Sequence, residues 1–146
     1  MFQLVSKNSE SIDFHGSWGR LGLNAKDFES RINLLGKNLV GGYVEATEKQ
    51  MGFEFSDWYA LHLPENNFIN LYFVGDASGS SIGHYGDDSP LGYEYKGTIQ
   101  ALPQEASYYP IMITYKGEKP NDDNGRIEPV NYSKIMKFDP IKKAYQ

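Results

Sequence analysis

Cysteine is absent from the 146 residues of this chain. Without thiols the chain forms no disulfide, no thiolate zinc site and no cysteine nucleophile. Long hydrophobic runs are also lacking, because no stretch approaches the roughly 18 apolar residues of a membrane-spanning helix. The first residues carry neither the basic patch nor the apolar stretch of a secretory signal. We therefore expect no membrane insertion, and a cytoplasmic or particle-associated location is favoured.

Positive charge is scarce. Fourteen Lys and Arg oppose nineteen Asp and Glu, which gives a formal net charge of -5 at pH 7. Arginine occurs only at the widely spaced positions Arg20, Arg31 and Arg126. A nucleic-acid-binding surface needs clustered basic side chains to neutralise phosphates. We therefore expect no nucleic-acid partner.

Established catalytic and cofactor motifs are missing as well. The chain has no GxxxxGK[ST] phosphate loop and no HExxH zinc pattern, and its three histidines lie far apart. Residues 120–131 match a calcium-binding EF-hand loop only in part, since Pro120 and Asn131 stand where its two anchoring carboxylates belong. A hairpin tip explains the Asp-Asn-Gly of this segment without an ion. We expect no catalytic residue, no metal site and no cofactor, which favours a protein that is not an enzyme.

What the sequence does contain is the two-residue alternation of β-strands. Odd positions from Met51 to Leu63 are mostly apolar, and residues 93–101 and 109–115 repeat this pattern. Phe68–Val74 is a nearly continuous apolar run, as in a strand covered on both faces. Short connections rich in turn residues separate these segments. They predict a mainly β fold, an antiparallel sandwich or barrel of about seven to eight strands.

One short amphipathic helix is predicted over about residues 25–36. Phe28, Ile32 and Leu35 recur at helical spacing on one face, and Gly36 supplies the stop. A helix of this length must pack against a sheet to be stable.

The whole chain, residues 1–146, is expected to form a single domain. Residues 75–91 are rich in Gly, Ser and Asp and predict a long flexible loop, and residues 140–146 predict a short polar tail. The loop contains the residue types of a Ser-His-Asp triad, but a triad needs side chains on rigid elements. We interpret the loop as a partner-binding segment. Its candidate binding residues are Asp76, His84 and Tyr85.

Asp57 is the most informative single residue. It stands at an apolar-face position of the strand, directly before Trp58. A buried carboxylate is unfavourable unless it is paired, and burial raises its pKa. One interpretation is a general base or ligand anchor in a pocket. The favoured one is a β-bulge that lets Asp57 face water and turns Trp58 inward. Both residues are candidates for binding.

Aromatic residues are abundant, with eleven Tyr, eight Phe and two Trp. Tyrosine combines apolar area with a polar tip, which suits protein interfaces and ligand-binding faces. High β-propensity alone also places it on exposed sheet surfaces. Tyr93 and Tyr95, in the tyrosine-rich C-terminal half, are further candidate binding residues.

A local motif lies near the N-terminus. The run Phe14-His15-Gly16-Ser17-Trp18, followed by Phe28 and Leu34-Leu35-Gly36, resembles the Gly-x-Trp entry of lipocalins and fatty-acid-binding proteins. In those families the Trp closes the base of a ligand-holding barrel and often packs on a late Arg, here Arg126. The resemblance covers a short part of the chain, and the evenly spaced strands and late motif of the families are not evident. It implies that Trp18 helps to bind a small apolar ligand.

The leading prediction is a non-enzymatic protein-interaction module, such as a subunit of a larger phage- or particle-like assembly or a small inhibitor- or immunity-type partner. It would bind another protein chain, or a copy of itself, by edge-strand pairing or through a tyrosine-rich face. One alternative is a carrier of a small hydrophobic ligand with a lipocalin-like barrel lined by Trp18, Phe53, Phe55 and Tyr59. The other alternative is a small enzyme that uses Asp57 or His84 as an acid or base.

Overall fold

The computed structural model describes residues 2–7, 11–16, 19–24, 35–37, 39, 41–62 and 68–146. Residues 2–24 and 68–70 of this set are described by their backbone alone. In chain order the elements are β1 (Phe2–Lys7), β2 (Ser11–Gly16), β3 (Gly19–Asn24), β4 (Gly41–Gln50), β5 (Phe53–His62), β6 (Phe68–Ser80), α2 (Ile82–Tyr85), β7 (Glu94–Ala101), β8 (Ile111–Pro120), β9 (Ile127–Met136), β10 (Phe138–Asp139) and β11 (Ala144–Tyr145). Every strand pair is antiparallel, which confirms the predicted mainly β, antiparallel fold.

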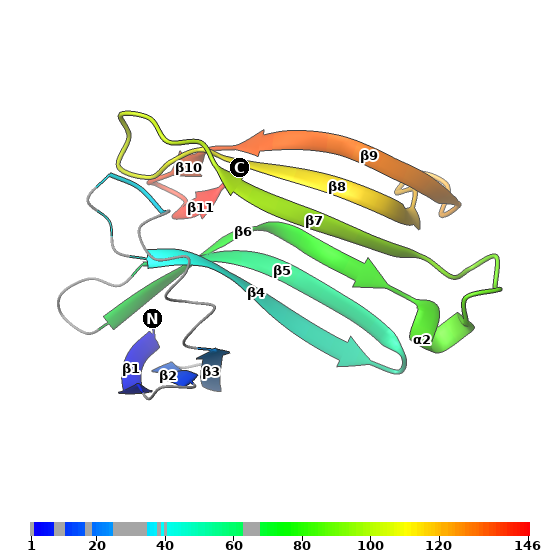
Figure 1. Ribbon diagram of the computed structural model, residues 1–146, viewed down its shortest axis with the longest axis horizontal. Coiled ribbons are helices and arrows are strands. Elements are labelled where there is room, and N and C mark those ends of the chain that lie inside the picture. Colours follow the sequence, from blue (N-terminus) through cyan, green and yellow to red (C-terminus); the bar gives the residue numbers. More distant parts are fainter. Residues whose placement is uncertain are drawn as a thin grey trace.

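The six central strands form two layers that join at one corner (Figure 1). β4, β5 and β6 pair in order in one layer, and β7, β8 and β9 pair in order in the other. Among the described strands, the layers share a ladder only where Ser78–Ser80 of β6 pairs with Glu94–Lys96 of β7. The β1–β3 meander extends the start of β6, through Phe2 and Gln3. The result is sandwich-like, and the lipocalin-like closed barrel is not found in the described part of the chain.

The β5–β6 ladder has two irregularities close to the joint, which we define as the short β6–β7 ladder that connects the layers. The register of β5 with β4 is unbroken, whereas its register with β6 shifts at Asp57 and again after Trp58. The residues of β6 left without a β5 partner are Ala77 and Val74, and both are buried. A bulge bends a strand and increases its twist. The bulges therefore lie on β6, while β5 keeps its plain alternation.

That alternation buries Ser56, Trp58 and Ala60 at the middle even positions of β5, whereas Phe55 on the opposite face is 47% exposed. Leu61, near the end of the strand, is the buried residue of the odd face. From Phe53 to Tyr59 the odd, aromatic face is therefore not the core face that its apolar residues indicated. Trp58 points inward and Asp57 lies on the other side, without an extra residue in β5 itself.

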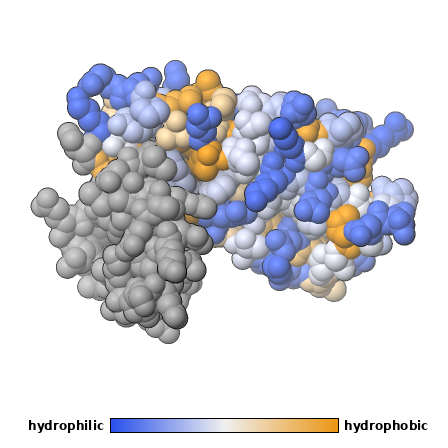
Figure 2. All heavy atoms as spheres, in the orientation of Figure 1, coloured by the Kyte–Doolittle hydropathy of each residue, from blue (hydrophilic) through white to orange (hydrophobic). Residues whose placement is uncertain are grey.

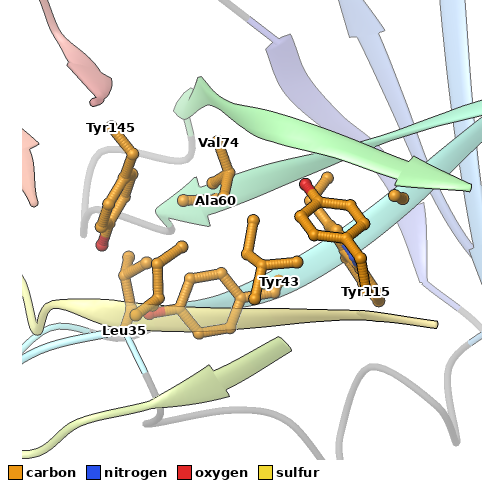
Figure 3. Packing of buried hydrophobic residues seen from close by; sticks show 10 residues of the cluster. Leu35, Tyr43, Ala60, Val74, Tyr115 and Tyr145 are labelled. Carbon is orange, nitrogen blue, oxygen red and sulfur yellow. The ribbon is translucent and has the colours of Figure 1, made fainter. Parts of the chain in front are cut away.

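The core fills the space between the two layers (Figure 3). Its buried members are Leu35, Tyr43, Trp58, Ala60, Val74, Ala77, Ile111, Ile113, Tyr115 and Tyr145. Buried Trp and Tyr need partners for their polar atoms. Trp58 Nε1 donates to the main-chain oxygen of Gly97 at 3.1 Å, and Tyr115 Oη donates to that of Asp76 at 2.7 Å. Both bonds cross from one layer to the other.

The predicted loop at residues 75–91 is partly a strand. Residues 75–80 complete β6, residues 82–85 form α2, and turns follow. Main-chain pairing with β5 and β7 holds the Gly- and Ser-rich end of β6, and such pairing does not require apolar side chains. The loop prediction took this composition for a turn signal.

The predicted polar tail at residues 140–146 is folded in part. β11 pairs with β10, and Tyr145 is buried with 3% exposure. Tyr145 Oη donates to the main-chain oxygen of Tyr109 at 3.2 Å, which ties the end of the chain to the core.

The predicted helix at 25–36 falls mostly on residues 25–34, which lie outside the described residues. Of its last two positions, Leu35 is buried in the core and Gly36 forms an isolated bridge with Leu39. In the part of the chain that is described, no helix has the length and hydropathy to cross a membrane.

We expect Tyr115→Phe to lower the free energy of unfolding by about 1–2 kcal/mol, because the partly buried main-chain carbonyl of Asp76 loses its donor. Urea denaturation measures this loss. Tyr132→Phe is the matched control, since Tyr132 is 45% exposed and its hydroxyl makes no hydrogen bond with a described residue. Equal stability of the two variants would show that the Tyr115 bond does not fasten the layers.

Candidate functional site

Strand register brings acidic and aromatic side chains together on the outer face of β5 and β6. Asp57 pairs with Asp76 across the β5–β6 ladder, and Tyr59 pairs with Phe73. Partners in an antiparallel ladder project to the same face. We define the acidic–aromatic face as Phe55, Asp57, Tyr59, Phe73, Asp76 and Tyr95.

Tyr95 reaches this face from β7 because a glycine lies in its path. Gly79 pairs with Phe55 on one side and with Tyr95 on the other. A Cβ atom at Gly79 would lie 2.6 Å from Tyr95 Cε1, which no side chain allows. The Tyr95 ring therefore lies over the Gly79 backbone, and its hydroxyl donates to Asp76 Oδ1 at 2.9 Å.

The environment of Asp76 changes its acidity. Burial raises the pKa of the Asp76 carboxyl above its ordinary value of 3.8, and the charge of Asp57 raises it further. The Tyr95 hydrogen bond and the positive charges of Lys119 and Lys134 act in the opposite direction. Burial is the largest of these effects, so Asp76 keeps its proton to a higher pH than an exposed Asp does.

Asp57 is a half-buried carboxylate without a hydrogen bond or ion pair to any described residue. Partial burial raises its pKa, and its charge also helps to raise the pKa of Tyr59. The two carboxylates therefore differ. Asp76 is held by a tyrosine hydroxyl, whereas Asp57 is left to the solvent or to a partner.

Two lysines lie over tyrosine rings and act on the Asp76 carboxylate. Lys119 Nζ is 5.4 Å from the centre of the Tyr95 ring, and Lys134 Nζ is 5.4 Å from that of Tyr115. This geometry gives cation–π attraction. The ammonium groups are thus positioned by aromatic rings, and they contribute positive charge near Asp76.

A second aromatic group continues the surface to the end of the molecule, where α2 lies in Figure 1. Phe53 stacks on His84 with ring centres 4.5 Å apart and contacts the edge of Tyr85 at 5.7 Å. His84 Nδ1 lies 2.7 Å from the main-chain oxygen of Met51, as a hydrogen bond. These contacts hold α2 against the β4–β5 turn, with Tyr85 42% exposed.

The structure brings together some of the predicted site residues and separates others. Asp57, Asp76 and Tyr95 meet on the acidic–aromatic face, and Tyr93 stacks beside Tyr95 with ring centres 6.3 Å apart. His84 and Tyr85 belong to the group at the end of the molecule. Trp58 is buried on the opposite side of β5, and Trp18 lies outside the described residues.

Residues predicted to line an apolar interior lie elsewhere. Phe53, Phe55 and Tyr59 belong to the outer side of β5, so they do not form the inner wall of a ligand-holding barrel. Sequence reasoning also missed Phe73, Lys119 and Lys134. Phe73 was part of an apolar run that suggested burial on both faces, and nothing in the sequence placed the two lysines near Asp76.

The chemistry of this face suits binding. It offers carboxylate oxygens, phenol hydroxyls and ring surfaces, which recognise ligands through hydrogen bonds, charge and stacking. Within the described residues, no group of three or more His, Cys, Asp or Glu is arranged to hold a metal ion.

We expect Tyr95→Phe to raise the pKa of Asp76, because the lost hydrogen bond stabilises the ionised carboxylate. Carbon-13 NMR of the Asp carboxyl groups during a pH titration measures the shift. Tyr93→Phe is the control, since Tyr93 stacks on Tyr95 but makes no hydrogen bond to Asp76. An unchanged titration of Asp76 in Tyr95→Phe would contradict this description of the site.

No family model, no curated protein and no solved structure matches this chain.

Proposed function

We propose that this chain is a non-enzymatic protein-interaction module that binds another protein chain through the acidic–aromatic face. The observation that carries the proposal is the exposure of large rings beside half-buried carboxylates. Phe55 is 47% exposed and Phe73 is 46% exposed. Aromatic residues are enriched in protein interfaces, and they supply many of the side chains that dominate binding energy.

Ring packing supports the proposal because it fixes the exposed aromatics before binding. Phe73 meets Tyr59 edge to face with ring centres 5.8 Å apart, and Phe55 stacks with Phe53 at 6.1 Å. Side chains that are already ordered lose little conformational entropy when a partner docks. Such rings can serve as anchors for a partner without rearrangement.

The charge of Asp57 would make the proposed contact specific for a partner with a basic side chain. Asp57 lies between the two ring pairs with no partner among the described residues, and the whole chain carries a formal charge of -5. A Lys or Arg on the partner would complement Asp57, and the overall charge would speed encounter with a basic surface. A subunit of a larger assembly and a small inhibitor would each use such a face.

Figure 2 shows one side of the molecule, on which hydrophilic residues predominate and hydrophobic ones form separate patches. Scattered apolar residues of this kind are normal on a protein surface. The acidic–aromatic face combines two ordered ring pairs with one unpaired carboxylate.

We expect the double variant Phe55→Ser/Phe73→Ser to bind its partner at least about tenfold more weakly, because central aromatic anchors carry most of the energy of an interface. The tagged protein is purified from its source cells, and co-purifying chains are quantified by mass spectrometry. Light scattering over a wide concentration range detects self-association.

Ile135→Ser/Ile141→Ser is the matched control, since these side chains are 57% and 91% exposed and lie outside the face. The control variant should keep the partner. A wild-type protein that stays monomeric and captures no chain beyond those captured by the Phe55→Ser/Phe73→Ser variant would refute the proposal.

A further inference from the structure

A pocket of about 390 Å³ opens on the side of β5 opposite to the acidic–aromatic face. Its lining residues are Tyr43, Glu45, Trp58, Lys96, Gly97, Thr98, Ile99 and Ala101. The volume falls in the range of ligand pockets in proteins, roughly 300–1,000 Å³. The walls come from β4 and β5 on one side and from β7 on the other.

The apolar wall of the pocket is rigid. Trp58 and Tyr43 are only 5% and 3% exposed, and both belong to the core cluster. The indole N–H of Trp58 donates to the Gly97 carbonyl, which fixes the orientation of the ring. Ile99 and Ala101 extend this wall along β7. One apolar side chain fits such a recess without rearrangement of the protein.

The second feature of the pocket is a free strand edge. β7 pairs with β6 through Glu94–Lys96, and from Gly97 onward this edge has no ladder partner among the described strands. Alternate residues of an antiparallel strand direct their N–H and C=O groups to the same edge. Because the Gly97 carbonyl faces Trp58, the N–H and C=O of Ile99 also face the pocket side.

Opposite charges mark the outer part of the pocket. Glu45 and Lys96 are both exposed, and both also line the smaller recess next to it. Glu45 Oε1 accepts a hydrogen bond from Ser78 Oγ at 3.2 Å. A peptide with polar residues on either side of one apolar residue could form hydrogen bonds or ion pairs with these side chains.

We propose that this pocket binds an extended peptide segment, which adds to the free edge of β7 and places one apolar side chain against Trp58. Strand addition supplies main-chain hydrogen bonds, while the pocket selects the side chain. A small apolar molecule would fill the recess but would leave the Ile99 peptide groups unpaired. The site lies on the other side of β5 from the acidic–aromatic face, so it goes beyond the proposed function.

The test uses linear heptapeptides selected from a phage-displayed library against the wild-type protein and then synthesised. We expect the selected peptides to share one apolar residue and to shift the NMR signals of the Ile99 amide and the Trp58 indole N–H. Methylation of successive peptide nitrogens should weaken binding at least tenfold at every second position only, because alternate amides face β7. If methylation left binding unchanged at every peptide nitrogen, the peptide would not add to β7 as a strand. If no peptide were selected from the library, the proposed binding site would be wrong.

Two protein variants locate the site. Ala101→Phe fills the pocket and should weaken binding of the selected peptide at least tenfold, whereas Gln100→Phe, an exposed neighbour that does not line it, should not. Circular dichroism verifies that both variants are folded. The Phe55→Ser/Phe73→Ser variant should bind the peptide as the wild type does, which separates this site from the acidic–aromatic face. Unchanged binding by folded Ala101→Phe would place the peptide elsewhere and overturn the proposal.

Discussion

Two core side chains, Trp58 and Tyr115, donate hydrogen bonds across the gap between the layers where their shared ladder ends. β6 and β7 pair through three residues each, and beyond that point the bonds from Trp58 to Gly97 and from Tyr115 to Asp76 span the gap. Each bond comes from a large ring that also fills the core. The same two side chains therefore provide both the packing between the layers and the hydrogen bonds of their buried polar atoms. The two bulges of β6 make this arrangement possible, because they turn Val74 and Ala77 into the space between the layers.

The joint also gives one strand two chemically different sides, and we propose a binding role for each. The even side of β5 places Trp58 in the core and at the wall of the pocket, where the edge of β7 is free. The odd side carries Asp57 between exposed rings, next to the Asp76 carboxyl that Tyr95 holds. Successive side chains of β5 point to opposite faces of the sheet, so the apolar pocket and the acidic–aromatic face lie on opposite sides of this strand.

Local pattern was enough to predict a mainly β, antiparallel fold, but it did not show which side of β5 is buried. Both sides carry large apolar residues, Phe55 and Tyr59 on one and Trp58 on the other, and the bulges that decide between them lie on β6. The Gly- and Ser-rich end of β6 looked like a loop because its stability comes from main-chain pairing. Asp76 and Tyr95 were each identified as candidates, yet their contact depends on Gly79 and on the β6–β7 register, which no local pattern reveals.

The central claim is that the Trp58 and Tyr115 bonds close the same gap. A double-mutant cycle with Trp58→Phe, Tyr115→Phe and the combined variant, followed by urea denaturation, tests it most directly. Because both bonds restrain the same gap, the loss of one loosens the other, so removing the second should matter less. The combined loss should then fall short of the sum of the single losses by at least about 0.5 kcal/mol. Losses that add to within about 0.3 kcal/mol would show that the two bonds act independently and would contradict the account.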